Sequence, residues 1–204
     1  VNFYDGTVRV VDPEGREFCR YRPSEYLEHI AEAVMPYSYL KYPYLKKVGW
    51  KGLTDGVDSG VYRATPMSRL NVSDGMATPL AQAEYEKLYS TLTGDASGRK
   101  PVHATLAIHW ARVVEMVFAC EAVLKQAQDD EITSDKIHTP PESIVGEGVG
   151  IVEAPRGILT HHYKTDDKGF IREANLIVGT TNNNAGISMS IKKVAEGLIK
   201  KGQE

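Results

Sequence analysis

The residues best suited to chemistry lie in the run Glu153-Ala154-Pro155-Arg156-Gly157. An expected strand ends at Pro155, because proline lacks a backbone N–H and cannot continue a ladder. Gly157 lets the backbone pass close to a neighbour. Arg156 would therefore stand at a strand end, where its guanidinium could bind an anion or a small negatively charged ligand. The alternative is a surface turn in which Arg156 pairs with a carboxylate, and local sequence leaves both open.

A second polar cluster, Gly-Thr-Thr-Asn-Asn-Asn at 179–184, follows the apolar run Leu176–Val178. Small hydroxyl and amide side chains placed after a strand can supply several hydrogen bonds at one point. The simpler interpretation, which the residues by themselves favour, is a loop that caps the helix expected from Ile187.

Metal-ligating patterns are absent from the sequence. Cys19 and Cys120 are far apart and neither belongs to a C-x-x-C pair, which excludes a disulfide framework and fits a reducing cytosol. His161 and His162 are adjacent in an expected strand, so they point to opposite faces and cannot share one metal. A structural histidine that faces the core is the expectation for one of them.

The elements that would position these residues form an α+β fold dominated by helices. Apolar and polar residues alternate over Thr7–Tyr21 around a turn at Asp12–Gly15, which predicts a hairpin. Three short strands that form a small antiparallel sheet are expected at 148–178, with a turn at Asp166–Gly169. We expect helices at Ser24 to about Val34, Pro79–Leu92, Pro101–Gln128 and Ile187–Lys200, and a long loop over residues 37–78.

The expected 101–128 helix carries a wide apolar stripe, which suits a helix buried in a multi-helix bundle. The residues of the stripe are Leu106, Trp110, Val113, Val117 and Leu124, broadened by Val114 and Phe118. We therefore treat residues 1–204 as part of a single domain in which 1–78 form a hairpin, a short helix and a loop, 79–128 form long helices, and 148–178 and 187–200 form the sheet and the last helix.

The composition, 42% hydrophobic and 25% charged in 204 residues, is that of a soluble globular protein. A net charge of −3 with no basic stripe makes nucleic acid a poor partner. No apolar run is long enough to span a bilayer, and no export signal follows Val1. Because the chain starts without Met and ends in a charged stretch, we expect a segment of a longer subunit.

Residues 148–184, with Glu-Ala-Pro-Arg-Gly at 153–157 and Val-Gly-Thr-Thr-Asn at 178–182, resemble the large subunit of nickel–iron hydrogenases. The segments at 37–41 and 62–70, and His-Trp-Ala-Arg at 109–112, look like further segments of that family in the same order. The resemblance thus covers essentially the whole chain. In detail the sequence is most similar to the F420-non-reducing, viologen-reducing hydrogenases of methanogens, cytosolic enzymes that work with a heterodisulfide reductase.

The resemblance implies a nickel–iron centre with cyanide and carbon monoxide ligands, held by two cysteine pairs that this segment lacks. Arg156 matches the family arginine that lies over the metals and contacts one cyanide, with Pro155 beside it. Thr180 matches the residue that hydrogen-bonds the other cyanide. Leu176 matches a residue whose backbone carbonyl binds a magnesium or iron ion. Gly179 stands where many relatives have proline.

The implied reaction is reversible heterolytic H₂ oxidation, with electrons passed through the iron–sulfur clusters of a small subunit to an electron-transfer subunit and a heterodisulfide reductase in the cytoplasm. We hypothesise that Arg156 polarises H₂ and transiently accepts its proton, which requires an unusual desolvation because guanidinium is a very weak acid. A cysteine thiolate as base, with Arg156 purely electrostatic, is the alternative. The 204-residue segment alone is expected to be inactive.

Two other readings compete with the hydrogenase. A metal-free relative could serve as a quinone-module subunit or as a scaffold subunit of a respiratory-type complex. The quinone-binding branch typically has lysine at the position of Arg156 and glutamate after the glycine, where this chain has Ile158. Arg156 and the Thr180–Thr181 pair therefore favour the hydrogenase.

Overall fold

The computed structural model describes residues 6–56 and 58–200. Its first element is the predicted hairpin, in which β1 (Val8–Val11) and β2 (Glu17–Tyr21) pair antiparallel. The Asp12 carboxylate closes the turn, since its Oδ1 accepts the backbone N–H groups of Glu14 and Arg16 at 3.0 and 2.9 Å. An aspartate that bonds the backbone ahead of it is a common turn device.

The helix predicted from Ser24 to Val34 is wrong in its second half. A short 3₁₀ turn, η1 (Pro23–Glu25), leads into α1 (Tyr26–His29), and the chain then extends as β3 (Ile30–Val34). This strand pairs antiparallel with β4 (Lys41–Leu45). β4 lies in the segment expected to be a loop, so the pairing partner that overrides the helical pattern was itself missed.

The predicted 37–78 loop also contains α2 (Pro66–Val72), whose first turn is capped by the Thr65 hydroxyl accepting from the Ser68 backbone N–H. α3 (Pro79–Thr93) agrees with the prediction. α4 (Ala107–Ala127) begins six residues later than expected from Pro101. These three helices enclose the larger apolar core, formed by Met67, Leu70, Tyr85, Leu88, Tyr89, Val102, Ala107, Ala111 and Val114.

The face of α4 that packs on the body coincides only in part with the predicted stripe, since Val114 is buried and Trp110 packs against the core. Its buried residues are Ala107, Ala111, Val114 and Glu115, whereas Leu106 and Leu124 are 78% and 62% exposed. Small side chains allow α4 to approach α2 and α3 closely, and several larger apolar residues, among them Val113, Met116 and Val123, face outward. The amphipathic pattern thus predicted the helix, but it did not predict in full which face of the helix packs against the described part of the chain.

A polar connector containing the 3₁₀ turn η2 (Asp130–Thr133) leads to the three-stranded sheet. β5 (Glu147–Ala154), β6 (Gly157–Thr165) and β7 (Ile171–Val178) pair in that order and form the antiparallel sheet that was predicted. A smaller apolar cluster, Tyr21, Tyr26, Ile30 and Ile177, joins the sheet to the N-terminal elements.

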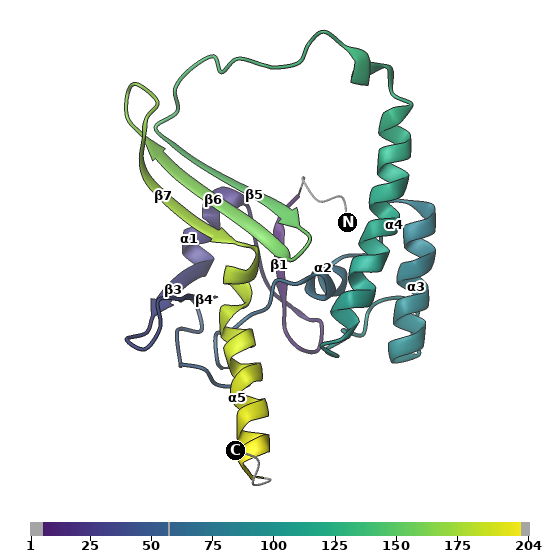
Figure 1. Ribbon diagram of the computed structural model, residues 1–204, viewed down its shortest axis with the longest axis vertical. Helices are drawn as coiled ribbons and strands as arrows, with labels where there is room; N and C mark the ends of the chain where they lie inside the picture. Colours follow the sequence, from purple (N-terminus) through teal and green to yellow (C-terminus); the bar gives the residue numbers. More distant parts are fainter. Residues whose placement is uncertain (1–5, 57, 201–204) are drawn as a thin grey trace.

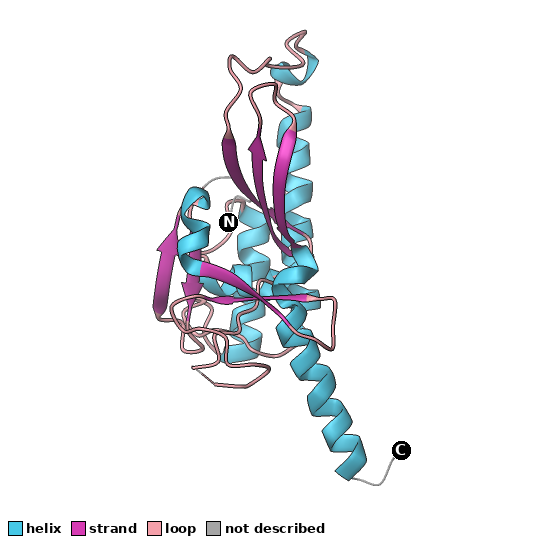
Figure 2. Ribbon diagram, turned by 90° about the vertical axis from the view of Figure 1, so that its left-hand side faces the viewer, coloured by secondary structure: helices cyan, strands magenta, loops and turns pink. Residues whose placement is uncertain are grey.

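After η3 (Gly179–Asn183), α5 (Asn184–Lys200) points away from the rest of the chain, as both views show (Figures 1 and 2). The sheet lies on one side and the α3–α4 pair on the other, with α2 between them (Figure 1). The fold is α+β with small antiparallel sheets, in agreement with the expectation from sequence. Among the described residues, no helix is long and apolar enough to cross a membrane.

Candidate functional site

Pro155 and Arg156 form the two-residue turn between β5 and β6, where Ala154 and Gly157 pair across the hairpin. Both turn residues are exposed. Within residues 6–56 and 58–200, the Arg156 side chain makes no hydrogen bond or ion pair. The alternative in which a carboxylate of this chain engages Arg156 is therefore not found there, and the guanidinium presents all its donors outward.

Gly157, the first residue of β6, passes close to the segment before α2, as expected from sequence. Its φ of +147° lies outside the range that side chains favour, and a Cβ there would overlap the Ala64 carbonyl oxygen. The Gly179 carbonyl oxygen would lie 3.2 Å from the same Cβ. Three chain segments thus meet at a point that only glycine fits.

Two asparagines, which the sequence interpretation assigned to helix capping, hold these segments together. The buried Asn183 side chain accepts the Ala64 backbone N–H at 2.9 Å and donates to the Ala64, Arg156 and Gly179 carbonyls at 3.2, 3.4 and 3.4 Å. Because one amide contacts both the Pro155–Arg156 turn and the start of η3, the two predicted polar segments are brought side by side.

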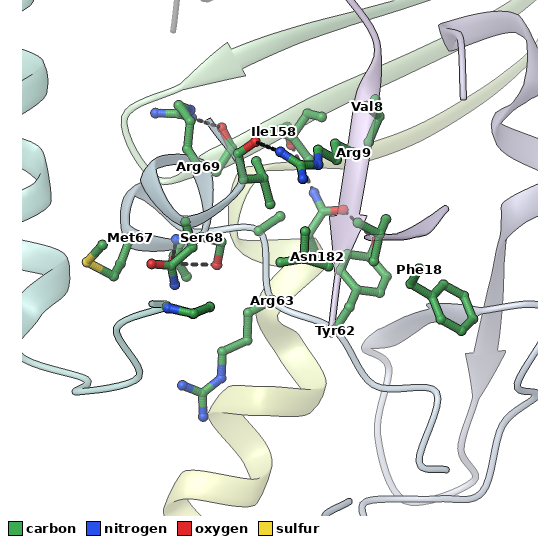
Figure 3. A pocket seen from close by; sticks show the side chains of 18 of the residues that line it. Val8, Arg9, Phe18, Tyr62, Arg63, Met67, Ser68, Arg69, Ile158 and Asn182 are labelled. Atoms are coloured by element: carbon green, nitrogen blue, oxygen red, sulfur yellow. Dashed lines mark hydrogen bonds between the residues drawn. The ribbon is translucent and has the colours of Figure 1, made fainter. Parts of the chain in front are cut away.

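Asn182 supports the same junction from the next position. Its amide Nδ2 donates to the Ile158 carbonyl at 2.9 Å, and its Oδ1 accepts the Tyr62 hydroxyl at 2.7 Å. Figure 3 shows Tyr62, Asn182 and Ile158 among the residues that line a hollow. Burial raises the pKa of the Tyr62 phenol well above its ordinary value, so the hydroxyl remains a donor at neutral pH.

Thr180 lies in η3, directly after β7, and its side chain is exposed. β5 ends, β6 begins and β7 ends at the same end of the antiparallel sheet. Thr180 therefore lies at the end of the sheet that carries Arg156. Gly179 has a φ of +50°, which proline cannot adopt because its ring fixes φ near −65°. The loop before Thr180 therefore has its own backbone geometry in this chain.

Leu176 lies in β7, opposite His161 of β6. β7 is an edge strand, so every second carbonyl along it points away from β6. The Leu176 side chain is 42% exposed. The four sequence-predicted site residues thus occupy one end of one sheet.

A buried ion cluster behind the turn was missed by the sequence interpretation. Arg69 of α2 donates from Nη1 to the Glu115 Oε1 at 2.6 Å, and its Nε lies 2.9 Å from the Glu153 Oε2. Burial raises the pKa of both carboxyls above their ordinary values, against the opposing effect of Arg69. The only local signal was Glu115 itself, a charged residue in the middle of an apolar helix.

The histidines take structural positions. His162 is 7% exposed and its Nδ1 lies 2.8 Å from the Tyr26 hydroxyl, while Nε2 lies 2.7 Å from the Glu147 Oε1. His161 faces the other way and contacts the Tyr163 hydroxyl. The described part of the chain contains no group of three or more His, Cys, Asp or Glu side chains that could hold a metal ion.

A hollow lies beside the turn rather than around Arg156. It is bounded by the β1–β2 hairpin, the segment before α2 and the start of β6 (Figure 3). Arg69, Gly157 and Asn182 are among its lining residues, but Arg156 and Thr180 are not. The hollow is therefore lined by residues that support the turn, and the predicted ligand-binding residues Arg156 and Thr180 do not line it.

Comparison with known proteins gives consistent matches over nearly the whole chain. A family model described as nickel-dependent hydrogenase matches residues 16–195. An iron-sulfur subunit of the F420-non-reducing hydrogenase of Archaeoglobus profundus is 47% identical over 100% of the chain and 41% of the relative. The corresponding F420-non-reducing hydrogenase subunit of Methanothermobacter marburgensis is 45% identical over 98% of the chain and 40% of its own length.

A more distant relative and a solved structure also match the chain. The NAD-reducing hydrogenase HoxS subunit beta of Cupriavidus necator is 37% identical over 98% of the chain and 39% of its own length. The crystal structure of an NAD⁺-reducing [NiFe]-hydrogenase in the H₂-reduced state superposes with a TM-score of 0.77 at 35% identity, covering 91% of this chain and 38% of that one. The chain spans about two fifths of the length of the curated relatives it matches.

Proposed function

Because the chain belongs to the nickel-dependent hydrogenase family, we propose that it is part of the catalytic large subunit of an H₂-oxidising enzyme. The observation that carries the proposal is the turn at Pro155–Arg156. It presents an arginine with no side-chain partner among the described residues, at the end of the sheet where Thr180 follows β7, inside the segment that the family model matches. The hydrogenase names of the relatives give no support to a metal-free quinone-module or scaffold subunit.

The donors on the described chain suit one side of a nickel–iron group that carries cyanide and carbon monoxide. A buried anionic ligand needs strong hydrogen-bond donors to offset its lost hydration. Arg156 and Thr180 offer a guanidinium and a hydroxyl from one sheet edge, and Pro155 sets the backbone of the turn. When bound, the group supplies the Lewis-acid site for heterolytic cleavage of H₂.

The residues that would ligate nickel and iron are not provided by the described chain. Cys19 is partly buried in the N-terminal hairpin, and Cys120 is exposed on α4. We propose that the cysteine pairs of the family come from other parts of the gene product. The Leu176 carbonyl on the edge strand β7 is proposed as one ligand of a magnesium or iron ion.

Arg156 acts on H₂ and on its proton in this proposal. Its Nη groups polarise H₂ from the open side of the site. To accept the proton, the side chain must first be in its neutral guanidine form, which only an unusual desolvation in the assembled site would provide, and accepting the proton returns it to guanidinium. The alternative proton acceptor is a cysteine thiolate, in which case Arg156 contributes only its charge. Electrons leave through an iron–sulfur small subunit toward a heterodisulfide reductase, in the cytoplasm, as in the methanogen subgroup that the sequence resembles.

The experiment is the substitution Arg156→Lys in the complete gene product, purified with its partner subunit and loaded with nickel. Lysine keeps the positive charge but loses the planar fork. If Arg156 donates to the site in the transition state, we expect the turnover number for H₂ oxidation to fall by roughly 10²-fold. Arg172→Lys, which changes an exposed arginine on β7 of the same sheet, is the matched control.

Two outcomes decide the role of Arg156. A turnover number near that of the unsubstituted enzyme, at equal nickel content, would exclude Arg156 as the base. A loss confined to Arg156→Lys and absent from Arg172→Lys would support a direct role at the site.

A further inference from the structure

Arg69 makes contacts that converge on the base of the Pro155–Arg156 turn. Its side chain is only 4% exposed. A single terminal nitrogen, Nη2, donates to the carbonyl oxygens of both Ala154 and Gly157 at 2.7 Å. Those two residues immediately flank the turn and pair with each other across the hairpin. One guanidinium therefore hydrogen-bonds to the backbone at both ends of the turn that carries Arg156.

The remaining nitrogens of Arg69 are fixed by carboxylates. Glu115 of α4 accepts from Nη1 at 2.6 Å, and the Glu153 carboxylate of β5 lies 2.9 Å from Nε. Four acceptors in different directions match the rigid fork of an arginine. A buried cation also needs such partners, because desolvation without them would be strongly unfavourable.

The opposite side of the turn is held separately. The Arg156 carbonyl accepts from the Asn183 amide at 3.4 Å, and that amide also binds the Ala64 backbone. Arg69 connects the turn to α2 and α4, and Asn183 connects it to η3. The backbone at Arg156 is thereby fixed to the helices α2 and α4 on one side and to η3 on the other.

We propose that Arg69, itself oriented by Glu115 and Glu153, is a positioning residue that sets the direction in which Arg156 projects. The inference rests on the proposed function, since it gives Arg69 a role in H₂ oxidation through Arg156. Arg69 does not touch the reacting atoms. It acts by fixing the carbonyl groups of Ala154 and Gly157, the residues on either side of the Pro155–Arg156 turn.

The test uses the complete nickel-loaded enzyme with its partner subunit and the substitution Arg69→Lys. Lysine keeps the charge but cannot reach four dispersed acceptors from one ammonium. Because small misplacements of a positioned group can cost roughly 10²-fold in rate, we expect a fall in the turnover number of up to that size. The second readout is the infrared spectrum, in which the cyanide stretching bands should shift in the same direction as in Arg156→Lys.

A double substitution separates positioning from general damage to the structure. If Arg69 acts through Arg156, then Arg69→Lys should change neither rate nor bands further when Arg156→Lys is already present, since coupled residues are non-additive. Fully additive effects would overturn the proposal. So would unchanged bands and turnover in Arg69→Lys at equal nickel content. Arg172→Lys again serves as the control that should leave both readouts unchanged.

Failure of the proposed function gives a different pattern. In that case Arg156→Lys itself leaves rate and bands unchanged, and the positioning role is refuted along with it. If only the inference fails, Arg156→Lys is impaired while Arg69→Lys is not. Should Arg69→Lys fail to fold or to take up nickel, Glu115→Ala replaces it, because it removes the 2.6 Å bond that orients the guanidinium. Unchanged bands and turnover in Glu115→Ala would overturn the proposal as well.

Discussion

Gly157 lies where β6 passes the segment before α2, and the backbone on the other side of the contact cannot move away easily. Both the N–H and the carbonyl of Ala64 are bonded to the Asn183 side chain. A Cβ at position 157 would overlap that carbonyl oxygen, and a φ of +147° would be strained for any side chain. The contact therefore constrains the residue type at 157 independently of any direct role in chemistry.

Gly157→Ala is expected to lower the free energy of unfolding by about 3 kcal/mol, from backbone strain together with overpacking. Urea denaturation of the protein and its variant measures the difference. Gly148→Ala in β5 is the matched control, because a Cβ there meets nothing within 4 Å and should change stability by no more than about 0.5 kcal/mol. Equal unfolding midpoints for the two variants would contradict the close approach at Gly157.

The residues of the turn could be predicted from sequence because their signals are local. Pro155 ends a strand and Gly157 permits a close approach, whatever lies nearby. Arg69 and Glu115 could not be paired in advance, since they are 46 residues apart and belong to different helices. Asn183 was assigned to a helix cap for the same reason, because its partner Ala64 is 119 residues away.

At the scale of elements, α4 stabilises the N-terminus of α3 with a carboxylate. The Glu121 carboxylate accepts the Thr78 hydroxyl at 2.6 Å and the backbone N–H groups of Leu80 and Ala81 at 3.1 and 3.0 Å. The bond from Thr78 is the main reason that the pKa of Glu121 is lowered. The Glu121 carboxylate of α4 therefore caps the N-terminus of α3, which the Thr78 side chain does not do.

The lowered pKa of Glu121 predicts a loss of stability in acid. Its contribution is present above the ordinary pKa of 4.5 and is lost as the pH falls through the lowered value in the folded state. Glu121→Gln should therefore flatten the dependence of the urea midpoint on pH below 4.5. Parallel curves for the two proteins in that range would contradict the assignment.

Glu115 on the same helix provides a contrast of opposite sign. Burial raises its pKa above 4.5, so the native state binds this proton more readily than the unfolded state. Its contribution to stability then decreases as the pH rises from 4.5 through the raised value. In Glu115→Gln this decrease should be absent, which distinguishes the two carboxylates in one series of measurements.

The elements themselves were predicted where local patterning agrees with tertiary pairing. The Asp166–Gly169 turn and the alternation in β6 and β7 specify the hairpin. Between Tyr26 and Val34 the apolar spacing favours a helix, yet β3 forms because β4 is available to pair with it. A strand whose partner was assigned to a loop cannot be recognised from its own residues.

At the scale of the whole molecule, large apolar faces remain uncovered by the described residues. Met116 and Val123 on α4 are 63% and 62% exposed. On α5, Ile187, Ile191, Val194 and Leu198 follow the three- and four-residue spacing of one helix face and are between 43% and 64% exposed. These faces accord with a chain that spans about two fifths of its relatives' length. The resemblance in sequence identified the family and the missing cysteine pairs, but it could not show that Arg69 and Asn183 hold the backbone of the Pro155–Arg156 turn.

The 204-residue chain by itself is therefore expected to bind no stoichiometric nickel and to show no H₂ oxidation. Its described residues contain no cluster of three or more metal-ligating His, Cys, Asp or Glu side chains, and Cys19 and Cys120 lie on separate elements. Arg156 and Thr180 are donors, suited to ligands of a metal rather than to the metal itself. The measurement is metal analysis of the purified chain after incubation with nickel, with the complete gene product and its partner subunit as the positive control. One nickel per chain, retained after exchange into metal-free buffer, would show that the described residues hold a site of their own and would refute the assignment of the ligands to other parts of the gene product.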